Sequence, residues 1–100
     1  MYQYKNPYII DFTGVKYYLQ IHEIIKEALD FPDYYGKNWD AFWDCLGELS
    51  PVPTVIELIG FGEAYGRLGY PMTVLLNILH DFRRLRGETV EILFDRAPEA

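Results

Sequence analysis

Three short runs of β-branched and aromatic residues predict β-strands. They cover residues 8–12, 54–59 and 89–94. Pro53 and Gly60 bound the second run, as expected where a strand gives way to turns. This run is the most apolar of the three, so we expect it to form the central strand of a sheet.

Between these runs, hydrophobic residues recur three and four positions apart, which predicts amphipathic helices. The first helix should end near Pro32, because proline disfavours helical geometry in the residue before it. The second should begin after Asn38, which is suited to cap a helix, and run to about Leu49. A third, long helix should end at Gly87. The residues that recur at this spacing are Ile21, Ile24, Ile25, Ala28 and Leu29 in the first helix, and Leu75, Ile78, Leu79, Phe82 and Leu85 in the third.

The remaining segment and the element order define the expected fold class. Residues 60–70 contain four of the eight glycines and are expected to form a loop, with room for a short helical turn. Strands that alternate with helices favour a parallel sheet, because a parallel return needs a crossover. We therefore predict an α/β fold in which a three-stranded parallel sheet packs with three or four helices. Residues 1–100 should form a single domain, and residues 96–100 should fray at its end.

Composition excludes several classes of protein. Half of the residues are hydrophobic and 24% are charged, which is typical of a globular protein rather than a disordered one. No stretch approaches the roughly 18 apolar residues that span a bilayer, and the N-terminal residues lack the pattern of a secretory signal. Cys45 is the lone cysteine, so we expect no internal disulfide and a cytoplasmic protein. His22 and His80 have no set of ligands around them, so no metal or cofactor is expected, and His22 should fill a structural place on the first helix.

The net charge of −6 lies entirely in the middle third of the chain. Residues 30–63 contain seven acidic residues and one base, Lys37, whereas the remaining residues contain eight of each. A protein that binds a phosphate backbone usually carries the opposite sign, which argues against nucleic acid as the direct ligand. Six aromatic residues fall within positions 31–43 of the same stretch, so a functional site is expected there.

The second predicted helix carries its acidic residues on one face. Asp40, Asp44 and Glu48 are four positions apart and form an acidic stripe opposite the expected core residues. Like charges at this spacing destabilise a helix by roughly 0.2–0.5 kcal/mol per pair, and no lysine or arginine lies within the helix to relieve them. Trp39 and Trp43 border the stripe, and tryptophan beside charged residues is typical of a protein interface. The stripe therefore predicts a docking surface for a basic partner. The expected core residues of this helix are Phe42, Cys45, Leu46 and Leu49.

The residues around the acidic stripe match a known pattern. Positions 29–46 read LDFPDYYGKNWDAFWDCL, and this segment resembles the signature of the barstar family of ribonuclease inhibitors. The order of predicted elements is also similar along nearly the whole chain. The resemblance implies a three-stranded parallel sheet covered by helices. It also implies a protein that is not an enzyme and that blocks a small basic microbial ribonuclease of the barnase type. In this family the second helix and the preceding loop enter the active site of the nuclease.

The resemblance implies roles for individual residues. Asp44 would take the place of a substrate phosphate among the basic catalytic groups, Asp40 would pair with a second basic group, and Trp43 would pack beside an arginine. The two tyrosines of the loop would stack on the partner. Lys37 stands where the family often has an acid, which bears on the choice of partner. Asp81 is the candidate for a further acid from the last helix. The complete set of expected partner-binding residues is Tyr34, Tyr35, Gly36, Asn38, Trp39, Asp40, Trp43, Asp44, Glu48 and Asp81.

Two other functions fit the same residues. An acidic interaction module could bind a basic protein that is not a nuclease, and a small metal-dependent enzyme could use the stripe. A rigid helix cannot wrap a cation, so a metal ion there would bind weakly. An inhibitor would protect the producing cell before its nuclease is exported, as an antitoxin or immunity protein, which agrees with the expected cytoplasmic location. We expect such an inhibitor to be a monomer.

Overall fold

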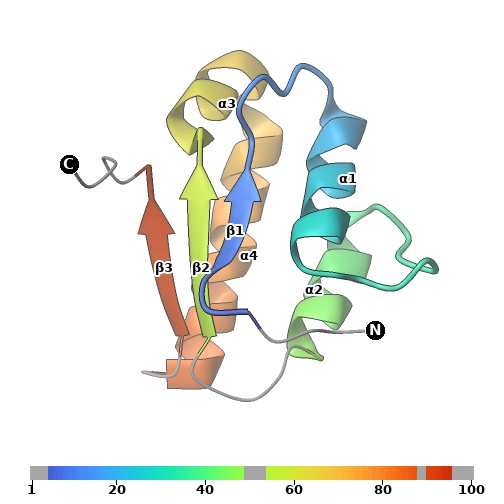
Figure 1. Cartoon of the computed structure of the whole chain (residues 1–100), viewed down its shortest axis with the longest axis vertical. Helices are drawn as coiled ribbons and strands as arrows, with labels where there is room; N and C mark the ends of the chain where they lie inside the picture. The colour runs from blue at the N-terminus through green and yellow to red at the C-terminus, as the bar shows by residue number, and fades with distance from the viewer. Residues whose placement is uncertain (1–4, 49–53, 88–89, 96–100) are drawn as a thin grey trace.

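The computed structural model of the protein describes residues 5–48, 54–87 and 90–95. Within these ranges the strands are β1 (Tyr8–Asp11), β2 (Thr54–Ile59) and β3 (Val90–Phe94). They form a parallel sheet in the order β1-β2-β3, with Ile10 opposite Leu58 and Ile56 opposite Ile92 (Figure 1). The predicted α/β class and the central position of β2 are therefore confirmed. The predictions for Leu49, Thr89 and residues 96–100 lie outside the described residues.

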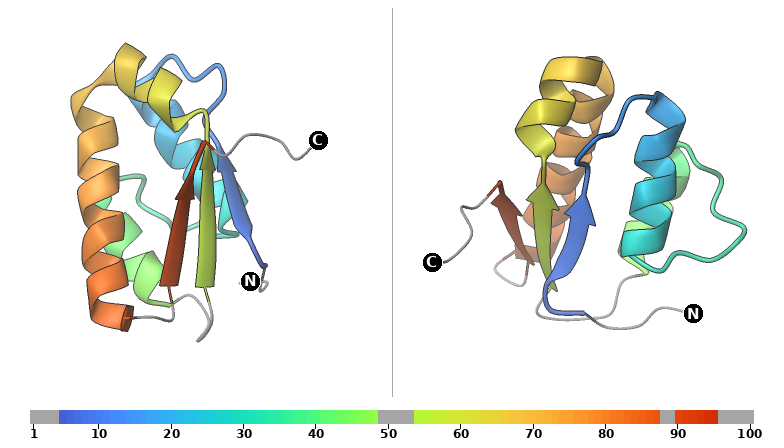
Figure 2. Two further views of the ribbon diagram at one scale, coloured as in Figure 1. Left: turned by 90° about the vertical axis from the view of Figure 1, so that its left-hand side faces the viewer. Right: turned by 45° about the horizontal axis from the view of Figure 1, so that its top comes forward.

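Four helices connect and cover the strands in the described part of the chain. They are α1 (Tyr18–Ala28), α2 (Trp39–Gly47), α3 (Phe61–Leu68) and α4 (Tyr70–Arg86). The helices gather on one side of the sheet (Figure 2). Strand residues accordingly alternate, so that Tyr8 and Ile10 of β1 are buried beneath the helices while Ile9 is exposed on the other side. The inner face of α2 packs toward α4, and its residues Phe42, Cys45 and Leu46 are buried, as the spacing predicted.

The expectation of a loop at residues 60–70 is wrong, because α3 occupies most of it. Gly60 adopts a left-handed conformation with φ of 71°, which a side chain would strain, and the helix starts at the next residue. The carboxylate of Asp95 accepts hydrogen bonds from the backbone N–H groups of Phe61 at 2.9 Å and Gly62 at 2.8 Å. These groups would otherwise lack partners at the start of the helix. Because Asp95 is distant from α3 in the sequence, no local pattern predicts that it caps this helix.

Replacing Asp95 by alanine is expected to lower the free energy of unfolding by about 1–2 kcal/mol, because two N–H groups at the start of α3 lose their acceptor. Urea unfolding monitored by circular dichroism measures the change. Asp33→Ala is the matched control, since Asp33 is an exposed acid whose single ion pair with Lys26 should contribute less than about 1 kcal/mol. Equal losses in the two variants would contradict a capping role for Asp95.

Candidate docking surface

Helix α2 presents an acidic face to the solvent. Asp40, Asp44 and Glu48 are exposed, on the opposite side of the helix from its buried residues. Neither the Asp40 nor the Asp44 carboxylate forms a hydrogen bond or ion pair with any residue that the structure describes. Trp43 lies beside them and is 37% exposed. The face thus combines uncompensated carboxylates with an accessible indole ring.

The start of α2 is fixed by the residues just before it. The Asn38 side-chain oxygen accepts a hydrogen bond from the Ala41 N–H at 2.8 Å, which confirms Asn38 as the N-cap. The Asn38 amide nitrogen donates to the Gly36 carbonyl at 3.2 Å. A β-carbon at Gly36 would lie 3.0 Å from this amide nitrogen, so glycine leaves room for the cap. Asp40 lies in the first turn, where the helix dipole favours a negative charge.

The far end of α2 receives a cation that the sequence reasoning missed. The Arg86 guanidinium, from the last turn of α4, donates a hydrogen bond to the Gly47 carbonyl at 2.8 Å and lies over the Phe82 ring at 5.2 Å. A positive charge is favourable at a helix C-terminus, so Arg86 stabilises the end of α2 from outside. The sequence shows the arginines before Gly87, but it does not show that Arg86 reaches the end of another helix.

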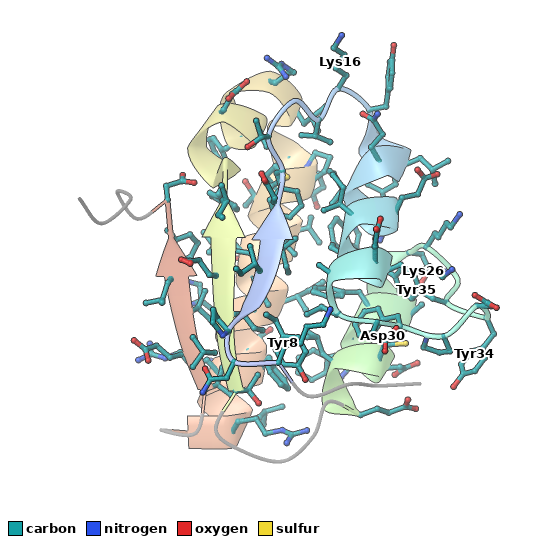
Figure 3. All side chains as sticks on the ribbon, in the orientation of Figure 1. Tyr8, Lys16, Lys26, Asp30, Tyr34 and Tyr35 are labelled. Atoms are coloured by element: carbon teal, nitrogen blue, oxygen red, sulfur yellow. The ribbon has the colours of Figure 1, made fainter. Side chains whose placement is uncertain are left out.

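The two neighbouring tyrosines of the loop before α2 point in different directions. Tyr34 is 77% exposed and extends away from the body of the molecule (Figure 3). Tyr35 is only 4% exposed and packs against Phe31, with 5.2 Å between the ring centroids. Burial, with smaller effects from Cys45 and Tyr18, raises the pKa of the Tyr35 phenol above its usual value. Stacking on a partner requires an exposed ring, and in the free protein Tyr35 does not meet that expectation.

Two ion pairs connect the same loop to α1. Lys26 of α1 lies 3.3 Å from the Asp33 carboxylate, and Lys37 lies 4.0 Å from Glu23 of α1. Lys37 adopts a left-handed conformation with φ of 52°. Its ammonium group is thus drawn toward α1, and its charge is partly balanced there.

A buried imidazole lies beneath the loop and the start of α2. His22 of α1 is fully buried, with Nδ1 2.6 Å from the Tyr35 phenol oxygen and Nε2 3.1 Å from that of Tyr18. The Trp39 indole lies against the imidazole at 4.4 Å between ring centroids. The expected structural place for His22 is confirmed, and burial lowers its pKa. The sequence does not show that His22 joins α1, the loop and α2. Tyr18 lies one turn away on the same helix, but Tyr35 and Trp39 come from other segments.

The free energy of unfolding is expected to fall as the pH drops below 6.5, the ordinary pKa of histidine. Because the pKa of His22 is lower in the folded protein, the unfolded chain takes up a proton in this range while the folded protein does not. The contribution is complete above pH 6.5 and is lost as the pH falls toward the lower pKa of the folded state. Urea unfolding at several pH values measures the loss. The step should vanish in His22→Phe and persist in His80→Phe, and its survival in His22→Phe would contradict the assignment.

Asp81 differs from the acids of α2 in its surroundings. It lies on the exposed side of α4, and its carboxylate accepts a hydrogen bond from the Arg84 guanidinium at 2.7 Å. His80 and Arg83 line the same shallow depression. The charge of Asp81 is therefore compensated by its own helix, unlike the charges of Asp40 and Asp44.

No three acidic, histidine or cysteine side chains within residues 5–48, 54–87 and 90–95 are grouped in a way that could hold a metal ion. No helix in the described part of the chain is both long and apolar enough to cross a bilayer.

Comparison with known sequences shows the family to which the chain belongs. The sequence model of the barstar (barnase inhibitor) family matches residues 6–95, nearly the whole chain. The chain therefore belongs to the barstar family, as its central segment suggested. It is also 32% identical over 75 residues to a protein of Bacillus subtilis (strain 168) that is named "Putative ribonuclease inhibitor YrdF". That similarity covers 75% of this chain and 82% of the relative.

Proposed function

We propose that the protein is a stoichiometric inhibitor of a small basic ribonuclease of the barnase type. It acts by occlusion rather than catalysis and needs no cofactor. The observation that carries the proposal is the pair of exposed carboxylates, Asp40 and Asp44, which have no partner among the described residues although they share one helix face. Membership of the barstar family and the printed name of the Bacillus subtilis relative support it.

The physical basis of the inhibition is charge complementarity. A ribonuclease must present cationic groups to the phosphates of its substrate, and two carboxylates on one rigid helix can fill such a cleft. The same carboxylates repel each other in the free protein, and this repulsion ends when basic groups of the partner lie between them. A feature that costs stability in the free protein but favours the complex is typical of a functional surface.

Each residue of the proposed docking surface would have its own role. Asp44 would lie centrally among the basic groups of the nuclease, Asp40 would pair with a second basic group, and Trp43 would pack beside an arginine. Tyr34 supplies the exposed ring of the loop. Tyr35 would contribute indirectly, because its buried ring and its hydrogen bond to His22 hold the loop in position. Contributions from Gly36, Asn38, Trp39 and Glu48 remain part of the proposal, and Asp81, already paired with Arg84, would contribute least.

The test is titration of barnase with the purified protein during RNA cleavage. We expect activity to fall in proportion to added inhibitor and to vanish near one equivalent, because each inhibitor molecule blocks one active site. A basic ribonuclease of an unrelated fold serves as the control for specific recognition. Undiminished cleavage by barnase at micromolar inhibitor would overturn the proposed target. Binding without inhibition would instead favour an acidic interaction module.

A cellular role follows from the proposal. An inhibitor of this kind would act as a monomer in the cytoplasm of a cell that makes the nuclease, as an immunity protein. Fusing the gene of the nuclease to an inducible promoter tests this role, since cells should survive induction only when the inhibitor is also made.

A further inference from the structure

The first turn of α1 carries an exposed aromatic residue that the core does not need. Tyr18 is 42% exposed, and it lies between the two exposed residues Tyr17 and Leu19. Its ring meets the Trp39 ring edge-on, with 6.1 Å between centroids and 80° between planes. Trp39 is the first residue of α2 and directly precedes Asp40. Tyr18 therefore extends the accessible surface of α2 onto a second helix.

The orientation of the Tyr18 ring is set from inside the protein. Its phenol oxygen lies 3.1 Å from Nε2 of His22, and the ring also meets the imidazole edge-on at 5.2 Å. The other ring nitrogen of His22 is engaged by Tyr35, so the imidazole cannot turn without breaking a second hydrogen bond. A half-exposed tyrosine normally samples several rotamers, and a fixed one loses less entropy when it binds a partner.

We propose that Tyr18 and Trp39, which we call the aromatic corner, form part of the docking surface and receive a basic side chain from the rim of the nuclease. The inference rests on the proposed function and extends its surface to α1. Aromatic faces attract guanidinium and ammonium groups. Asp40, the residue of α2 that follows Trp39, is exposed, and its negative charge adds to the attraction of this region for a cation. His22 is a positioning residue for the corner, because it fixes Tyr18 and packs against Trp39.

The first experiment measures the kinetics of binding to barnase. Tyr18→Ala is expected to increase the dissociation rate about tenfold and to change the association rate less than twofold, since the corner adds short-range contact and no net charge. Tyr18→Phe keeps the ring and loses only the hydrogen bond, so about a threefold increase is expected. Tyr70→Ala is the matched control, because Tyr70 is a tyrosine on α4 that is 78% exposed. If Tyr18→Ala dissociates at the parental rate, the aromatic corner is not part of the docking surface.

The second experiment uses the unmodified protein, so that a folding defect cannot confuse the result. Hydroxyl-radical footprinting reports the solvent exposure of individual tyrosines in the free protein and in its complex with barnase. We expect Tyr18 to be protected in the complex together with Tyr34, while Tyr70 stays reactive. Unchanged oxidation of Tyr18 beside a protected Tyr34 would overturn the corner and leave the proposed function intact. Failure of the parent to bind barnase would overturn the proposed target, and the corner with it.

Discussion

Asp44→Ala is expected to weaken binding to the target ribonuclease by about 2–5 kcal/mol or more, mostly through faster dissociation. Removal of the carboxylate would leave basic groups of the nuclease buried in the interface without a partner, and this costs more than the loss of one contact. The range is typical of hydrogen-bonded charge pairs at interfaces, and complexes of the barstar family are among the examples that define it. Surface plasmon resonance with barnase gives both rate constants.

The same substitution should leave the free protein slightly more stable. Asp44 lies four residues from Asp40 and from Glu48, so its removal relieves two repulsive pairs of roughly 0.2–0.5 kcal/mol each. A loss of affinity without a loss of stability separates a docking role from a structural one. Asp81→Ala is the matched control, because Asp81 is an exposed helical acid that Arg84 already compensates. Equal affinity of Asp44→Ala and the parent would refute the central role of this carboxylate.

The association rate with barnase is expected to fall at least about tenfold between roughly 0.01 M and 1 M salt. Over this range the screening length shrinks from roughly 30 Å to roughly 3 Å, so the acidic face no longer attracts a basic partner at a distance. The dissociation rate should change much less, because the charges in the complex are shielded from the solvent. Stopped-flow measurement of the Trp fluorescence change provides the rates.

Two variants test whether the salt dependence arises on α2. The double substitution Asp40→Asn with Asp44→Asn should flatten the dependence, since it removes the two uncompensated charges and keeps the side-chain shape. Trp43→Ala should keep the dependence and speed up dissociation, because it removes contact area and no charge. A dependence that is equally steep in the double variant would place the steering charges elsewhere.

The elements of the fold that could be predicted are those whose signals are local. The β-branched run at residues 54–59 matched β2 without error, and the spacing of Phe42, Cys45 and Leu46 identified the buried face of α2. Helix α3 was not predicted, because its cap, Asp95, lies more than thirty residues away in the sequence and no local pattern identifies it as a cap. The glycine content of residues 60–70 indicated a loop, whereas hydrogen bonds from Phe61 and Gly62 to the distant Asp95 stabilise the start of a helix.

The candidate site was predictable to a similar degree. Helical periodicity alone placed Asp40 and Asp44 on the exposed face, where the structure also finds them. The opposite directions of Tyr34 and Tyr35 could not be read from two identical adjacent residues in a loop. Tyr35 is the buried one of the two because His22, on α1, is its hydrogen-bond partner. Contacts between distant segments were the information that the sequence pattern lacked.

The packing of α2 against α4 places the buried residues of α2 on one side of the helix and the proposed docking surface on the other. Phe42, Cys45 and Leu46 hold the helix against the core, together with the caps at Asn38 and Arg86 and the contact of Trp39 with His22. The exposed residues of α2 are therefore expected to tolerate substitution with the fold retained. When the residues that hold the helix are separate from those that would contact a partner, the choice of partner can change while the fold is retained. A library randomised at the outward positions of α2 would thus be a practical source of binders for other cationic enzymes.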